Sequence, residues 1–108
     1  MAFVRACAVS ELAPESALAV EVGEEDVAVV QSGGQFYAIR DECSHASIPL
    51  SEGDVGDAEI ECYLHGSRFS LRNGAALGLP ATEPVPVYPC RVSGDDIEVD
   101  VDNPLPAP

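Results

Sequence analysis

The chain lacks several features that whole classes of protein need. It has no lysine, because all five of its basic residues are arginines, and these are scattered along its 108 residues. Phosphate binding needs clustered basic side chains, so the composition argues against nucleic acid as a partner. No run of 18 apolar residues occurs, so we expect no membrane-spanning helix.

Histidine is also scarce, since it occurs only at positions 45 and 65. If both bind metal, as argued below, no histidine is left for acid–base catalysis. The sequence shows neither a Ser-His-Asp set nor a glycine-rich phosphate loop. We therefore expect that the chain is not an enzyme by itself.

The beginning of the chain and its cysteines bear on the compartment. Residues 1–9 lack the long apolar region of a signal peptide, so we expect a cytoplasmic protein. Four cysteines in such a protein indicate metal or redox use before disulfides. The length suits one domain, residues 1–108.

Charge is strongly one-sided, with 19 acidic residues and a formal net charge of −14. One interpretation is solubility alone. The other is an electrostatic surface that steers the protein onto basic partners. Both interpretations stay open at the level of sequence.

Short runs rich in Val, Ile, Tyr and Phe alternate with turn signals, and this pattern predicts an all-β fold. We expect strands over residues 3–9, 17–22, 27–31, 35–40, 58–62, 68–71, 87–92 and 97–101. Residues 41–56 show no clean period and are expected to be loop. Four prolines in 78–89 favour an extended covering loop, and the tail 103–108 is expected to be disordered.

Two short motifs are the most informative residues: Cys43-Ser44-His45 and, after sixteen residues, Cys62-Tyr63-Leu64-His65. Each offers one thiolate and one imidazole, donors that bind iron–sulfur clusters or zinc. Two Cys and two His could surround one zinc ion. Structural zinc sites, however, usually pair Cys with Cys and His with His. One of each per loop favours two metal ions side by side, each loop giving a Cys to one ion and a His to the other.

The combination of Cys-x-His, a gap of sixteen residues and Cys-x-x-His followed by Gly66 and Ser67 resembles the Rieske pattern. The resemblance covers nearly the whole chain. It is to the small bacterial Rieske ferredoxins of aromatic-ring-hydroxylating dioxygenases. Within that group the chain is similar to a version encoded beside iron–sulfur assembly proteins.

The resemblance implies an antiparallel β-sandwich made by both ends of the chain, with a small cluster-binding subdomain inserted at about 41–82. It also implies a proline loop that shields the cluster from a third side. The residues that resemble this loop are Gly78, Leu79, Pro80 and Ala81.

The resemblance further implies one [2Fe–2S] cluster and a role for each ligand. Cys43 and Cys62 would bind the buried iron. His45 and His65 would bind the outer iron through Nδ1, with their ring edges at the surface as the exit for the electron.

The same resemblance bears on the reduction potential. High-potential Rieske proteins join their ligand loops by a disulfide, and the corresponding positions here are Ile48 and Leu64. The tyrosine that donates a hydrogen bond to a ligand sulfur corresponds to Phe69, whereas Ser67 is kept and could donate to a cluster sulfide. Hydrogen bonds to sulfur stabilise the reduced cluster, so we expect a potential near the low end of the Rieske range, around −150 mV.

The remaining candidate residues have simpler interpretations. Cys7 and Cys90 lack partner donors and are expected to be buried thiols, with a disulfide between them as the alternative. Asp41 and Glu42 are expected to be solvated charges, or else part of a docking surface. The aromatic residues expected in the core are Phe36, Tyr37, Phe69 and Tyr88.

By this resemblance the chain carries single electrons between a flavin-dependent ferredoxin reductase and a terminal non-haem iron oxygenase. Two alternatives stay open. One is an accessory or regulatory role with iron–sulfur assembly proteins, for which the same ligands would serve. The other is a structural zinc module used for protein contacts.

Overall fold

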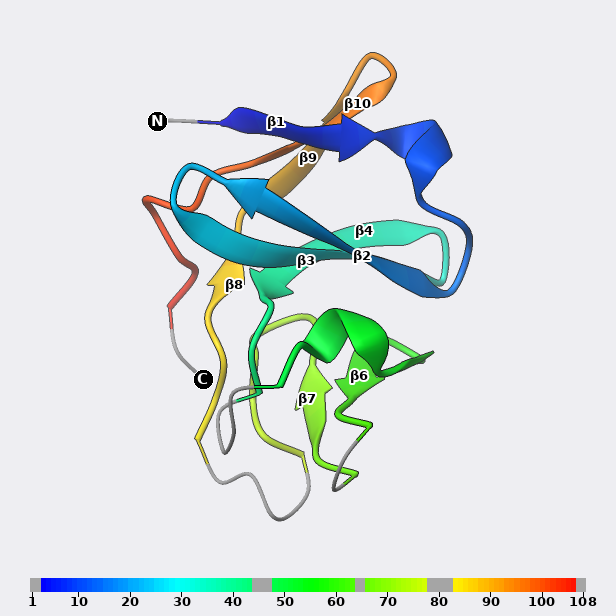
Figure 1. Ribbon diagram of the computed structural model, residues 1–108, viewed down its shortest axis with the longest axis vertical. Coiled ribbons are helices and arrows are strands. Elements are labelled where there is room, and N and C mark those ends of the chain that lie inside the picture. Colours follow the sequence, from blue (N-terminus) through cyan, green and yellow to red (C-terminus); the bar gives the residue numbers. More distant parts are fainter. Residues whose placement is uncertain (1–2, 44–47, 64–65, 78–82, 107–108) are drawn as a thin grey trace.

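Three small antiparallel sheets build the protein, and Figure 1 shows them one above another in the computed structural model. The structure describes residues 3–43, 48–63, 66–77 and 83–106. The first sheet has the order β1 (Val4–Ala8), β10 (Asp96–Val99), β9 (Cys90–Ser93). The second has the order β2 (Ser16–Val22), β3 (Glu25–Ser32), β4 (Gln35–Arg40), β8 (Val87–Tyr88). The third has the order β5 (Asp54–Gly56), β6 (Glu59–Glu61), β7 (Arg68–Ser70).

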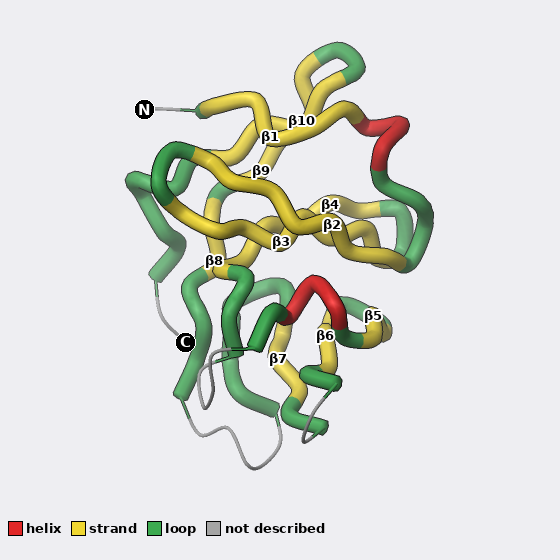
Figure 2. The backbone as a smooth tube through the Cα atoms, viewed as in Figure 1, coloured by secondary structure: helices red, strands yellow, loops and turns green. Residues whose placement is uncertain are grey.

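Strand β3 lies at the centre of the stack and is buried on both faces. Its side chains alternate, because successive residues of a strand point to opposite faces. Val27 and Val29 pack in one apolar core with Ile97 of the first sheet. Ala28 and Val30 pack in a second core, which contains residues of the third sheet. The second sheet is therefore a shared middle layer between two cores. Figure 2 shows its strands between those of the other two sheets.

The all-β class is confirmed, but one predicted strand is divided. The run 87–92 forms two strands that belong to different sheets, β8 beside β4 and β9 beside β10. Pro89 stands at the division and has no N–H to donate to a ladder. Its carbonyl accepts the N–H of Asp100 at 3.1 Å instead. The proline thus lets one segment join two layers.

The segment 41–56 is also more ordered than expected. It contains the short 3₁₀ turn η2 (Leu50–Glu52) and strand β5, and a second such turn, η1 (Val9–Glu11), follows β1. The hydrophobic pattern of the sequence did not indicate these three elements, because none of them is long enough to show a period. The first part of the tail is anchored as well, since the N–H of Leu105 donates to the carbonyl of Val87 at 2.8 Å.

The third sheet lies inside the segment 41–82 that we expected to form the inserted subdomain. The bounds of that subdomain stay a prediction. The residues Gly78, Leu79, Pro80 and Ala81 of the expected proline loop lie outside the described residues. Among the described residues, no helix has the length and hydropathy needed to cross a bilayer.

Candidate metal centre

The two cysteines of the motifs meet in one core. Cys43 follows the end of β4, and Cys62 directly follows the end of β6. Both are buried, and both belong to the core that lies between the second and third sheets. Strands that are far apart in the sequence therefore bring the two sulfur donors to one side of the middle layer. His45 and His65 lie outside the described residues.

Each cysteine starts a tightly closed loop. The N–H of Cys43 donates to the carbonyl of Ile48 at 2.9 Å. The N–H of Cys62 donates to the carbonyl of Ser67 at 2.7 Å, and the N–H of Gly66 returns to the carbonyl of Cys62 at 3.0 Å. Gly66 has φ +76°, a left-handed conformation that glycine adopts without a steric penalty. Backbone hydrogen bonds thus tie the buried cysteine at the start of each motif to a described residue beyond it.

These observations fit an iron–sulfur cluster. The cysteines are in no disulfide, and their burial removes water from the sulfur atoms. Soft thiolates in an apolar setting are the donors that iron–sulfur clusters use. In the described part of the chain, no group of three or more Cys, His, Asp or Glu side chains is arranged so that it could hold a metal ion. The search does not include His45 and His65, which lie outside the described residues, so the four-ligand set stays a prediction.

Asp41 is not the solvated charge that we expected. Its Oδ1 accepts the N–H of Ser51 at 2.7 Å, and its Oδ2 accepts the Ser51 hydroxyl at 2.8 Å. The N–H of Asp41 donates to the carbonyl of Asp26 at 2.9 Å. One residue therefore ties the start of the first ligand loop both to η2 and to β3. We call the Asp41–Ser51 pair the loop clamp.

Ser32, at the end of β3, makes a second tie that the sequence did not indicate. Its buried hydroxyl donates to the carbonyl of Gly56 at 2.7 Å and accepts the N–H of Ala58 at 2.9 Å. Ala58 has φ +55°, which is uncommon for a residue with a Cβ. The Ser32 hydroxyl thus fixes the β5–β6 turn against the middle layer.

The positions that bear on the reduction potential are partly described. Phe69 is fully buried in the core that holds both cysteines, and Ile48 packs against that core. Ser67 is buried as well. Leu64 lies outside the described residues. Of the other aromatic residues expected inside, Tyr88 is buried and Phe36 and Tyr37 are partly buried against the two cores.

Cys7 and Cys90 lie away from this site and form no disulfide, as expected; Cys7 is buried, whereas Cys90 is only partly buried. They stand on either side of β10, where Cys7 is opposite Ile97 and Cys90 is opposite Val99. Strands that flank a third are about 9.5 Å apart. A disulfide needs Cα atoms within about 7 Å, so this sheet order excludes one. Burial raises the pKa of Cys7 and, together with the nearby Cys7, raises the pKa of Cys90 to about 12.

The family model of the Rieske [2Fe-2S] domain matches residues 2–89. The chain belongs to the Rieske family. This Rieske protein is 41% identical over 102 residues to the ferredoxin component of biphenyl 2,3-dioxygenase from Rhodococcus jostii, covering 94% of this chain and 95% of the relative. It is 42% identical over 99 residues to the ferredoxin subunit of 3-phenylpropionate/cinnamic acid dioxygenase from Escherichia coli K12, covering 91% and 92% of the two chains.

Solved structures agree with these relatives. The ferredoxin of carbazole 1,9a-dioxygenase from Nocardioides aromaticivorans IC177 superposes with a TM-score of 0.86 at 39% identity, covering 92% of this chain and 97% of its own. The terminal oxygenase of the same system also contains the fold, but this chain covers only 29% of it. The Rieske protein therefore has the extent of a ferredoxin and holds one [2Fe–2S] cluster as an electron carrier. The zinc module is not supported.

Proposed function

We propose that this Rieske ferredoxin takes electrons from a flavin-dependent ferredoxin reductase and delivers them one at a time to a terminal non-haem iron oxygenase. The observation that supports this proposal most directly is that two buried cysteines, each at the start of a closed loop, meet in one core of a ferredoxin-sized Rieske fold. The relatives are named as components of dioxygenases, and they give no support to a role in cluster assembly. The protein is then a component of an oxidoreductase system rather than an enzyme by itself, and we propose the cytoplasm as its compartment.

The cluster-binding set in this proposal is Cys43, His45, Cys62 and His65. The cluster supplies one-electron redox chemistry when bound. The chain contributes two buried thiolates, and the apolar core around them excludes water from the sulfur atoms. Backbone hydrogen bonds tie each cysteine to a residue beyond its own motif, and the loop clamp holds the start of the first ligand loop.

Ligand substitution tests the set directly. We expect Cys43→Ser and Cys62→Ser to lose the visible colour and the EPR signal of a Rieske cluster, because each removes one of the two thiolates that would hold it. Cys7→Ala and Cys90→Ala serve as matched controls and should keep both. A Cys90→Ala protein that bleaches while Cys62→Ser stays coloured would show that the ligand set is wrong.

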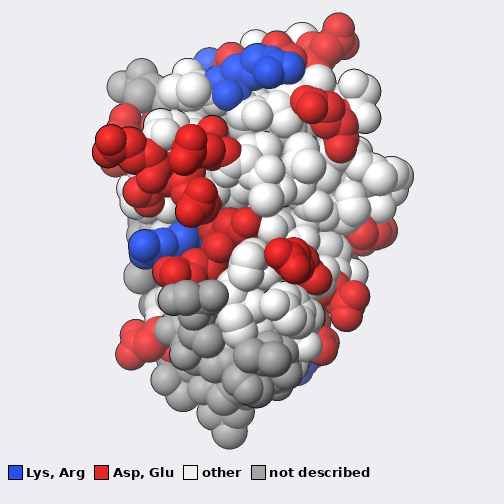
Figure 3. All heavy atoms as spheres, viewed as in Figure 1, with Lys and Arg blue, Asp and Glu red and all other residues white. Residues whose placement is uncertain are grey.

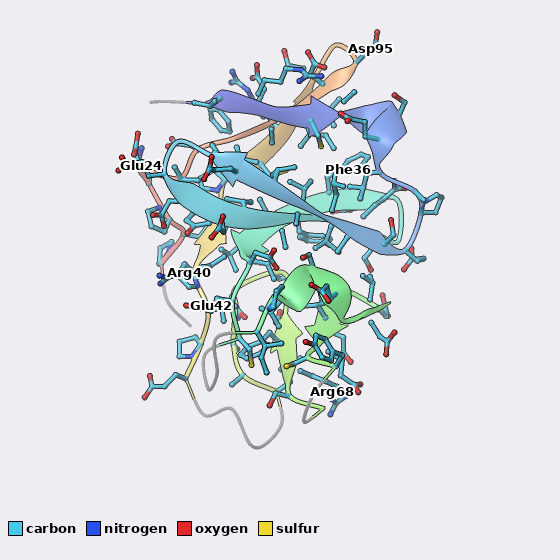
Figure 4. The ribbon with its side chains drawn as sticks, viewed as in Figure 1. Glu24, Phe36, Arg40, Glu42, Arg68 and Asp95 are labelled. Carbon is cyan, nitrogen blue, oxygen red and sulfur yellow. The ribbon has the colours of Figure 1, made fainter. Side chains whose placement is uncertain are left out.

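The acidic surface supports basic partners. Figure 3 shows acidic side chains gathered over the β2–β3 turn and just below it. A small polar hollow of about 130 Å³ lies there, lined by Glu24, Glu25, Asp26, Arg40, Asp41 and Glu42. Three of its lining residues, 40–42, immediately precede Cys43 in the chain. A partner attracted to these acids therefore approaches the first ligand loop. In Figure 4, Arg40 and Glu42 mark the place where the middle layer meets that loop.

Salt dependence separates steering from mere solubility. Charge steering weakens as the screening length falls to about 8 Å at physiological ionic strength. We therefore expect the association rate with an oxygenase to fall as salt rises, while the dissociation rate changes less. An association rate that stays flat from low to high salt removes steering and leaves solubility as the role of the acids.

A further inference from the structure

Tyr63 is an exposed aromatic side chain beside a proposed cluster ligand. It is 52% exposed, more than the other large apolar residues that stand out on the described surface. Single exposed apolar residues are common and need no explanation by themselves. Tyr63 differs in its position, because it follows the fully buried Cys62 directly.

The loop around Tyr63 is held from both ends. The N–H and the carbonyl of Cys62 are both used, by the carbonyl of Ser67 and the N–H of Gly66. The backbone that carries Tyr63 is thus closed into a turn before any partner binds. A side chain on a preorganised loop loses little conformational entropy when it is covered, which favours its use as a contact.

A second exposed apolar residue flanks the same loop. Leu77 is 44% exposed, and its N–H donates to the carbonyl of Arg68 at 2.7 Å. Arg68 directly follows Ser67, which closes the turn that carries Tyr63. Leu77 and Tyr63 therefore stand on either side of the segment 66–68.

Charged groups lie between and beside these two residues. Arg68 is bound to Glu59 at 3.2 Å on the same sheet, and Glu61 lies opposite Arg68 in the ladder. Tyrosine and arginine are enriched at protein interfaces, and tyrosine is enriched among the residues that dominate binding. Two of these three charged residues are acidic, in a chain of net charge −14, so a complementary surface offers apolar and basic groups side by side.

We propose that Tyr63 and Leu77 form the apolar contact by which this ferredoxin docks on the terminal oxygenase, a proposal that rests on the proposed function. The oxygenase is the occupant because a similar ferredoxin occurs in a complex of reduced oxygenase and oxidized ferredoxin in carbazole 1,9a-dioxygenase. That structure superposes with a TM-score of 0.83 at 35% identity. The contact lies next to Cys62, so docking there brings the oxygenase to the second ligand loop.

The test measures binding of the cluster-loaded ferredoxin to the terminal oxygenase of carbazole 1,9a-dioxygenase from Nocardioides aromaticivorans IC177, by calorimetry. We expect Tyr63→Ser to raise the Kd at least tenfold and Leu77→Ser at least threefold. Tyr63→Phe keeps the ring and should bind within twofold of the wild type. Midpoint potential and EPR spectrum should not change in any variant, which shows that the cluster is intact.

Val92→Ser is the matched control. Val92 is 49% exposed, close to the exposure of Tyr63, but it lies in β9. The turn that follows β9 holds Asp95, which Figure 4 shows at the end of the molecule opposite Arg68. Val92→Ser should therefore leave the Kd unchanged.

Three results would overturn the inference in distinguishable ways. A Kd for Tyr63→Ser within twofold of the wild type removes the contact and leaves the proposed function standing. If the variants lose only their rate of reduction by a flavin-dependent ferredoxin reductase, the surface is reassigned to the reductase and the oxygenase is removed as its occupant. If the wild type neither binds nor reduces the oxygenase while the Nocardioides ferredoxin does, the proposed function falls together with the docking surface.

Discussion

The loop clamp offers the sharpest test of how this fold holds its cluster. Asp41→Ala removes a carboxylate that accepts two hydrogen bonds from Ser51, at 2.7 and 2.8 Å. Hydrogen bonds to a charged group contribute about 1.5–3 kcal/mol each. Both residues are half-buried, so water can replace part of the loss and the lower end applies. The expected cost is about 3 kcal/mol for the two bonds.

The assay is the rate of cluster loss, followed by visible absorbance in the presence of an iron chelator. Unfolding of a protein with a bound cluster is not a two-state reaction, so a rate is more informative than a free energy of unfolding. If release proceeds through opening of the first ligand loop, about 3 kcal/mol corresponds to an increase of about a hundredfold. Asp41→Asn can still accept the Ser51 N–H and donate to its hydroxyl oxygen, so it should lose the cluster only about tenfold faster.

Glu42→Ala is the matched control, since Glu42 is the next residue and, within the described part of the chain, its side chain makes only an exposed ion pair with Arg40 at 3.8 Å. Such pairs contribute little to stability. The reasoning is refuted if Asp41→Ala and Glu42→Ala lose the cluster at the same rate, or if Asp41→Asn is as fast as Asp41→Ala.

Three further predictions concern individual side chains. The wild-type potential should lie near about −150 mV, and Phe69→Tyr should raise it because a hydroxyl in that core can donate to sulfur; a wild-type midpoint above about +100 mV would contradict the low-potential assignment. Because the pKa of Cys90 is raised to about 12 from 9.0, the unfolded state binds fewer protons above pH 9. Stability should therefore fall as pH rises from about 9 to 12, with a shallower fall in the urea midpoint for Cys90→Ala; coincident curves for the two proteins would rule this out. Ser32→Ala leaves the N–H of Ala58 and the carbonyl of Gly56 without their buried partner, at a cost of about 2–3 kcal/mol measured as a lower urea midpoint. Ser16→Ala, which loses only an exposed hydroxyl bond to a backbone carbonyl, is its control and should change little; equal shifts in both variants would disprove the buried role of Ser32.

The sequence by itself determined the class and the chemistry. Alternation such as Ile97, Glu98, Val99 is a local property of a strand with one buried face, so it can be read without knowing the partner strand. The Cys and His spacing is local too, because each pair lies within a single short loop. Donor type and spacing therefore predicted the metal chemistry, and the match to the Rieske domain over residues 2–89 confirmed the family.

Only the tertiary structure decided how the layers meet and which polar residues hold the site. The division of 87–92 between two sheets depends on which strands lie beside it. The sequence of that segment does not indicate that β4 and β10 are those neighbours. The bonds of Ser32 reach 24 and 26 residues along the chain, and the loop clamp reaches 10. A serine or aspartate in a loop has the same local pattern whether it faces water or a distant backbone group. Its role is settled when the folded chain brings that partner within hydrogen-bond distance and removes the water that would otherwise satisfy it.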